Sequence, residues 1–176
     1  SVINEGGFIG KIDKDGNYKW ATNFITGYHA TNIVLDSLEN IFYTGYFNTS
    51  SNGLIIGSKD SLGNTIWENT YGISGDRGYD IGINTNNELF ILGEVKSLSL
   101  NFGNGINIFK GGGGTAFLLK LDKVTGTVNW SKTFNYSTFV SRNMQLELTV
   151  NNNIVLYLYG DANGFDIDGG TTNYNS

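Results

Sequence analysis

One stretch of this chain, written three times, decides the fold. It reads GFIGKIDKDGNYKW at residues 7–20, GLIIGSKDSLGNTIW at residues 53–67 and AFLLKLDKVTGTVNW at residues 116–130. Each copy contains an apolar stretch, an aspartate, a turn with a glycine, and a tryptophan. Self-similarity of this kind indicates a repeat architecture, which sets the fold before any other signal is weighed.

A second pair of apolar segments follows each tryptophan, again joined by a short polar turn. The pairs are ATNIVLD and IFYTGYF, then GYDIGIN and ELFILGEV, then MQLELTV and IVLYLYG. Each unit is therefore expected to hold four short strands connected by tight turns. Units of this size and strand number are typical of β-propeller blades, so we predict an all-β fold of four-stranded antiparallel sheets.

The composition agrees with this fold and excludes several function classes. The 176 residues suit one domain and include 25 glycines and no proline. A net charge of −5 argues against a nucleic-acid partner, which requires a basic surface. No apolar run approaches the length of a membrane span. Cysteine is absent, which excludes disulfide and thiolate chemistry. The chain opens with Ser1, as a mature chain or an excised fragment would.

In this order, the segments GFIGKID, GISGDRGYDIGI, NELFILGEV and NFGNG resemble the SBBP-type bacterial β-propeller repeat. Members of that family carry similar runs, such as DAFVAKYD, GGSGDD, GNVYVTG and DFGGG. The resemblance covers nearly the whole chain and is strongest in the second copy. The third copy lacks the Gly-Ser-Gly-Asp core of the loop, and its aspartate-to-glycine turn is one residue longer. The resemblance implies that the tryptophan strand lies outermost in each blade.

With the tryptophan strand as the outermost strand of each blade, the chain begins and ends in the middle of a blade. The expected units are a half-blade at 7–24, a blade at 30–71, a blade at 78–134 with a hairpin insertion at 97–114, and a half-blade at 142–176. Trp20, Trp67 and Trp130 are expected to pack between blades. About three blades' worth of sequence cannot close a ring. We expect either a longer chain, which the mid-blade boundaries favour, or self-association of copies through open blade faces.

No pattern in the sequence supports catalysis, a cofactor or a metal. His29 is the single histidine, so a zinc site would lack ligands. Asp13, Asp60 and Asp122 recur at turns, where a carboxylate bonds backbone N–H groups. Asp76 is expected to order its own loop, residues 72–79, in the same way. We therefore predict that the chain is not an enzyme.

The strand phase gathers a set of loop residues on one face, where binding residues are usually placed. The candidates are Tyr28, His29, Asp76, Arg77, Phe139 and Arg142. From the resemblance we expect a non-catalytic, extracellular or cell-surface module that mediates protein interaction or assembly within a larger surface complex. A carbohydrate-binding propeller is one alternative. A propeller enzyme whose site lies partly in further blades is the other.

Overall fold

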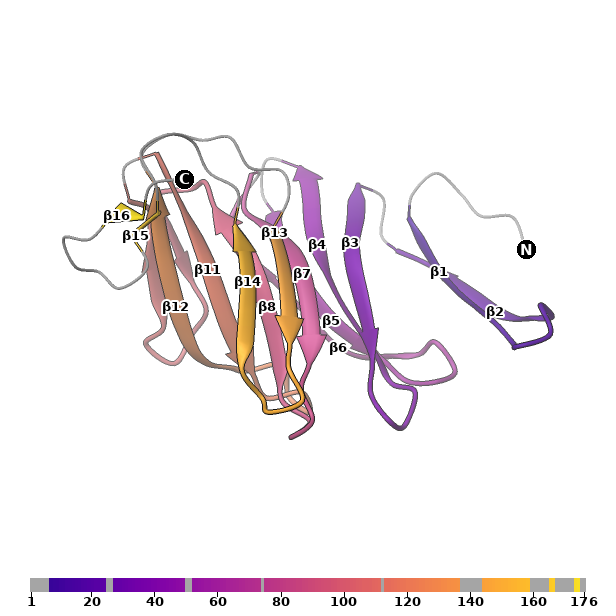
Figure 1. The fold of residues 1–176 in the computed structure, drawn as a ribbon. Coiled ribbons are helices and arrows are strands. Elements are labelled where there is room, and N and C mark those ends of the chain that lie inside the picture. The colour runs from indigo at the N-terminus through magenta and orange to yellow at the C-terminus, as the bar shows by residue number, and fades with distance from the viewer. Residues whose placement is uncertain are drawn as a thin grey trace.

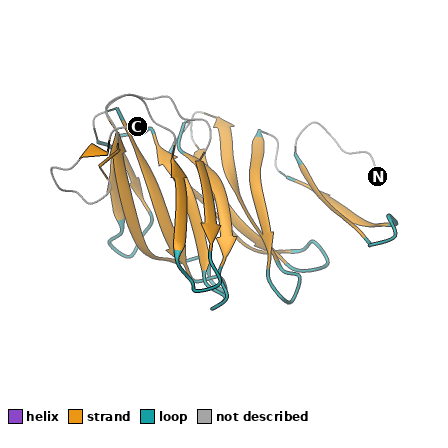
Figure 2. Cartoon of the chain, in the orientation of Figure 1, coloured by secondary structure: helices purple, strands orange, loops and turns teal. Residues whose placement is uncertain are grey.

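The computed structural model describes residues 7–24, 27–49, 52–73, 75–111, 113–136, 144–158, 165–166 and 173–174. The described residues form strands, turns and loops without a helix, which confirms the predicted all-β class (Figure 2). The strands are β1 (Phe8–Ile12), β2 (Tyr18–Asn23), β3 (Tyr28–Leu35), β4 (Ile41–Thr49), β5 (Asn52–Lys59), β6 (Thr65–Tyr71), β7 (Arg77–Ile83), β8 (Leu89–Val95), β9 (Ser99–Asn101), β10 (Asn107–Phe109), β11 (Gly114–Leu121), β12 (Val128–Tyr136), β13 (Met144–Leu148), β14 (Ile154–Leu158), β15 (Phe165–Asp166) and β16 (Asn173–Tyr174).

The strands form antiparallel sheets that stand side by side along the molecule (Figure 1). Strands β1 and β2 make an N-terminal hairpin, and β3-β4-β5-β6 make a four-stranded sheet. A six-stranded sheet has the order β7-β8-β11-β12-β15-β16, and β13–β14 make a C-terminal hairpin. Strands β9 and β10 form a small separate hairpin. Within the described part of the chain, no helix could cross a membrane.

An apolar layer fills each gap between neighbouring sheets. Ile9 and Phe24 of the N-terminal hairpin pack with Tyr43 of the four-stranded sheet. The largest layer joins the four-stranded and six-stranded sheets, with Ile56 and Phe117 among its members. A third layer joins the six-stranded sheet to the C-terminal hairpin. The four-stranded and six-stranded sheets therefore bury both faces against neighbouring sheets, whereas each terminal hairpin packs against one neighbour.

The pairing registers make the repeats equivalent residue by residue. Trp20 lies opposite Lys11, Trp67 opposite Ser58 and Trp130 opposite Lys120. In all three hairpins the register shifts at the next residue, where the turn begins. Strands β1, β5 and β11 are thus equivalent, and so are β4, β8 and β14, which pair in the same way with the strands that precede them.

The recurring aspartates form the turns as predicted. Asp13 Oδ1 accepts the N–H groups of Asp15 and Asn17 at 3.0 and 2.9 Å. Asp60 accepts the equivalent pair in the second copy, and Asp122 accepts two N–H groups in the third. The Gly16 N–H bonds the carbonyl three residues earlier, whereas the Gly126 N–H bonds the carbonyl four residues earlier. The third turn is therefore longer by one residue, as the sequence indicates.

Candidate functional site

The indole of Trp67 is seated on a turn of the following sheet. Its Nε1–H donates to the carbonyl of Lys123 at 2.9 Å. Gly126 lies beneath the ring at a φ of 72°, and a Cβ at that position would lie 2.5 Å from Cε3 of Trp67. The amide of Asn69 adds a bond to the Gly126 carbonyl at 3.2 Å. Only glycine leaves room for this contact, in a conformation that other residues rarely adopt.

Trp20 makes the same contact one sheet earlier. Its Nε1–H donates to the carbonyl of Ser61 at 3.1 Å. A Cβ on Gly63, which has a φ of 88°, would lie 3.0 Å from the Trp20 ring. Ser61 and Lys123 each follow the aspartate of their turn by one residue. Two successive interfaces between sheets therefore repeat one contact, a tryptophan on the aspartate–glycine turn of the next unit.

Trp130 is equivalent to Trp20 and Trp67, but no aspartate–glycine turn among the described residues contacts its ring. The side chain is 36% exposed. Its ring packs on Phe90, with centroids 6.1 Å apart, as Trp67 packs on the equivalent Phe42. Among the described residues, nothing accepts a hydrogen bond from the Trp130 indole. Trp130 is therefore positioned like Trp67 but presents its indole to the outside.

The face of β14 that points away from the six-stranded sheet is also exposed. Val155 is 54% exposed, whereas the equivalent Phe42 and Phe90 are 2% and 3% exposed. Tyr157 on the same face is also half exposed. Among the described strands, β14 pairs only with β13. We call Trp130, Val155 and Tyr157 the C-terminal end surface.

The opposite end of the series exposes the matching face of β1. Phe8 is 57% exposed, whereas the equivalent Ile55 and Phe117 are 1% and 0% exposed. Ile12 and Tyr18 are exposed beside it. Among the described strands, β1 pairs only with β2. We call Phe8, Ile12 and Tyr18 the N-terminal end surface.

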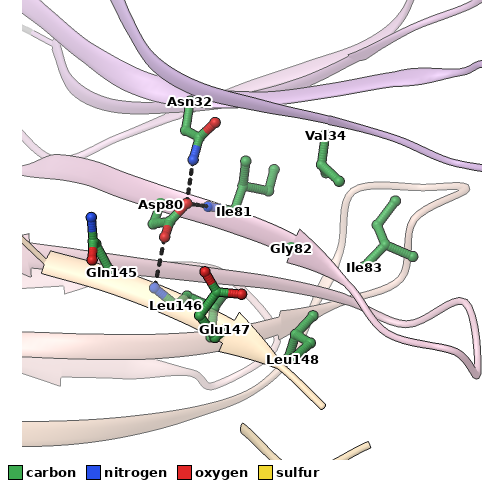
Figure 3. Close-up of a pocket in the computed structure, with 10 residues that line it drawn as sticks. All are labelled: Asn32, Val34, Asp80, Ile81, Gly82, Ile83, Gln145, Leu146, Glu147 and Leu148. Carbon is green, nitrogen blue, oxygen red and sulfur yellow. Dashed lines mark hydrogen bonds between the residues drawn. The ribbon is translucent and has the colours of Figure 1, made fainter. Parts of the chain in front are cut away.

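A pocket of about 410 Å³ lies where β3, β7 and β13 meet (Figure 3). The residues that line it are Asn32, Val34, Asp80, Ile81, Gly82, Ile83, Gln145, Leu146, Glu147 and Leu148. Figure 3 shows Asp80 between Asn32 and Leu146. Asp80 accepts the Asn32 amide and, at 2.6 Å, the Leu146 N–H. Its carboxylate thus ties three neighbouring strands together, and Gln145 and Glu147 supply exposed polar groups at the rim.

Two of the predicted loop-face residues are buried. Tyr28 is 2% exposed in the layer beside the N-terminal hairpin, and burial raises the pKa of its phenol. Asp76 is fully buried and accepts the N–H groups of Ile73, Lys96 and Ser97 at 2.8 to 2.9 Å. This bonding confirms that Asp76 orders its loop. Neither side chain is open to a ligand in this structure.

The other described loop-face residues form a stack. The ring of His29 lies parallel to that of Tyr46, with centroids 5.0 Å apart. The guanidinium of Arg77 lies 4.2 Å from the same ring. Tyr46 therefore contacts both His29 and Arg77, two of the residues predicted to lie on one loop face. Phe139 and Arg142 lie outside the described residues.

A buried carboxylate near this stack was not predicted from the sequence. Glu94 is fully buried; it accepts the hydroxyl of Tyr79 at 3.1 Å and that of Tyr136, and it lies 3.7 Å from Lys96. Burial raises the pKa of Glu94, and these partners oppose the shift. The one sequence feature that could have indicated this buried carboxylate is the glutamate within the apolar run LFILGEV. Its hydrogen bonds give Glu94 a structural role inside the six-stranded sheet. In the described part of the chain, no three potential metal-ligating side chains cluster.

The sequence matches no protein-family model and no curated protein. The kinship with SBBP-type repeats stays a prediction from the residues quoted above. Functional reasoning therefore depends on the geometry of this chain.

Proposed function

We propose that this chain is a non-catalytic module of the β-propeller type that binds another protein through its C-terminal end surface. The observation that carries the proposal is the exposed indole of Trp130, whose equivalents Trp20 and Trp67 are each seated on a protein turn. The exposed part of the Trp130 ring offers apolar surface and an indole N–H that bonds no acceptor among the described residues, and Val155 and Tyr157 expose further apolar surface on β14. Tryptophan and tyrosine are the residue types enriched at the energetic centre of protein interfaces.

The edge of β14 away from β13, which pairs with no described strand, adds a second means of recognition. An unpaired strand edge offers backbone N–H and C=O groups that a partner strand can bond. Addition of a strand to such an edge is a common mode of protein recognition, in which adjacent pockets give specificity. The C-terminal end surface supplies both features, so it favours a partner that brings a strand and a turn.

The resemblance to the SBBP-type repeat supports a location outside the cell or on its surface, in a bacterium, as part of a larger complex. Antibody labelling of intact cells of the source organism tests this part of the proposal. Labelling confined to permeabilised cells would contradict it.

The binding activity can be tested by supplying a partner in the same chain. A second copy of residues 7–24, appended after Ser176 through a flexible linker, brings a strand and an aspartate–glycine turn to the C-terminal end surface. We expect slower hydrogen exchange at the outward amides of β14 and a blue shift of Trp130 emission. The control is the same fusion with Gly16→Ala in the appended copy only. Identical exchange in both fusions would contradict the proposal.

A second candidate, carbohydrate binding, is favoured by the pocket in Figure 3. Its rim carries the amide of Gln145 and the carboxylate of Glu147, and polar groups of this kind orient sugar hydroxyls. We expect a glycan array to show binding that Gln145→Ala weakens. Absence of signal from the folded protein would eliminate this candidate.

A further inference from the structure

The two end surfaces are complementary halves of the contact that joins the internal sheets. One half is a tryptophan with an open strand edge, and it lies at the C-terminal end surface. The other half is an aspartate–glycine turn on a hairpin, and the N-terminal hairpin carries one. The inference below rests on the proposed function and names the partner of the same surface.

The turn of the N-terminal hairpin is built like the turn that receives Trp20. In both turns the aspartate accepts two N–H groups and the glycine N–H bonds the aspartate carbonyl at 3.0 Å. Gly16 has a φ of 85° and Gly63 one of 88°. A Cβ at Gly16 would meet no heavy atom within 4 Å. The space over Gly63 that the Trp20 ring fills is thus unfilled over Gly16.

The exposed strand edges match in the same way. The register of β4 with β5 places Ile41 opposite Lys59, and that of β8 with β11 places Leu89 opposite Leu121. Transferred to the equivalent strands, this register places Ile154 of β14 opposite Ile12 of β1. The N-terminal hairpin would then complete the C-terminal hairpin to a four-stranded antiparallel sheet.

We propose that a second copy of this chain binds head to tail, with its N-terminal hairpin against the C-terminal end surface of the first copy. Trp130 of one copy then covers Gly16 of the other and donates its indole N–H to the carbonyl of Lys14, which is equivalent to Ser61 and Lys123. Phe8 and Ile12 become buried against the six-stranded sheet, as Ile55 and Phe117 are buried in their own interfaces. Such a heterologous contact produces a closed ring or an open series of copies.

The partner is a second copy because this chain itself carries each element that the contact requires. The β1–β2 hairpin with its turn lies at one end of the series of sheets, and β12 and β14 lie toward the other (Figure 1). A single copy cannot bring them together without separating sheets that share buried apolar layers. Association of two copies buries the C-terminal end surface of one and the N-terminal end surface of the other. An unrelated protein with a single binding surface would cover one end surface.

Sedimentation velocity of the full chain over a wide concentration range provides the test. We expect the mass to rise with concentration, and Trp130→Ala and Gly16→Ala each to raise the dissociation constant about tenfold or more. Gly103→Ala is the matched control: Gly103 has a φ of 81° and, like Gly16, open space around it. It imposes the same backbone strain away from the contact. Circular dichroism establishes that each variant is folded.

Cross-linking identifies the geometry. Lys132 is equivalent to Asn69, which bonds the Gly126 carbonyl, so Lys132 of one copy should lie beside the Lys14 turn of the other. In a mixture of ¹⁵N-labelled and unlabelled protein, an amine-reactive linker should join Lys14 to Lys132 in mixed-isotope products. A monomer at every concentration would overturn the proposal, and so would association that neither Gly16→Ala nor Trp130→Ala weakens. A monomer in which the fused hairpin still protects β14 would leave the proposed function standing.

Discussion

Trp67 and Trp130 occupy equivalent positions but have different surroundings. Both lie on the strand that follows the aspartate–glycine turn of their unit, both pack on an equivalent phenylalanine, and both face away from the preceding sheet. Trp67 has the Lys123 carbonyl and Gly126 beneath its ring, whereas no turn among the described residues covers Trp130. The difference shows that burial at a repeat position is decided by the neighbouring unit, because the tryptophan and the phenylalanine beneath it are equivalent in both units.

The glycines of the three turns show the same difference from the other side of the contact. All three have φ between 72° and 88°, so each turn needs glycine for its backbone. A Cβ would lie 2.5 Å from the Trp67 ring at Gly126 and 3.0 Å from the Trp20 ring at Gly63, and would meet nothing at Gly16. The aspartate–glycine turn thus recurs along the chain, with one extra residue in the third copy, and the turns differ in whether a tryptophan covers the glycine.

Removal of the indole gives the largest expected effect. Trp67→Ala should lower the free energy of unfolding by about 2–4 kcal/mol, because it empties a packed interface and leaves the Lys123 carbonyl without its donor. Trp130→Ala should cost less than about 1 kcal/mol in the monomer, since the ring is exposed on one side. Urea denaturation at dilute protein concentration measures both. Equal losses would show that the two sites do not differ as described.

Addition of a methyl group to the turns should give a somewhat smaller difference. Gly126→Ala should cost about 2–3 kcal/mol, from backbone strain together with the clash against Trp67. Gly16→Ala has the strain alone and should cost about 1 kcal/mol. Gly63→Ala should lie between them, because its Cβ contact is less severe. Thermal denaturation of the three variants gives the ranking, and a Gly16 variant as unstable as the Gly126 variant would contradict it.

The sequence predicted the features that repeat and missed those that depend on neighbours. Glycine and aspartate spacing located the turns, and apolar alternation located the strands, because both are local properties of the chain. The burial of Tyr28 could not be predicted from its position near a loop. It depends on Ile9 and Phe24 of the N-terminal hairpin, and the sequence alone does not show that this hairpin packs against Tyr28. Likewise, a triplicated tryptophan suggested three equal packing sites. Only the arrangement of sheets shows that one of the three is exposed.

The ion pairs of the turns give the smallest expected effect and the one that depends on pH. In the occupied turn, Lys123 Nζ reaches Asp36 of the preceding sheet at 2.9 Å. In the unoccupied turn, the one described side chain that Lys14 bonds is that of its neighbour Asp15. Burial opposes ionisation of Asp36, but hydrogen bonds from Lys123, Asn40 and Leu38 outweigh it and lower its pKa below 3.8. Because the folded-state pKa is lowered, this group stabilises the fold above about pH 4, and the stabilisation is lost as the pH falls through the folded-state value.

Asp36→Asn should therefore lower the free energy of unfolding by about 0.5–1 kcal/mol at pH 6. The difference from the wild type should shrink as the pH falls below 3.8, because protonation of Asp36 then removes the same charge. Asp15→Asn is the matched control in the unoccupied turn, and it should leave stability unchanged because its exposed pair with Lys14 joins adjacent residues. Urea denaturation from pH 6 to pH 3 measures both differences. If Asp15→Asn lowered the free energy of unfolding as much as Asp36→Asn, the ion pair between Lys123 and the preceding sheet would add no stability. The contribution of a turn to stability would then not depend on whether a tryptophan covers it.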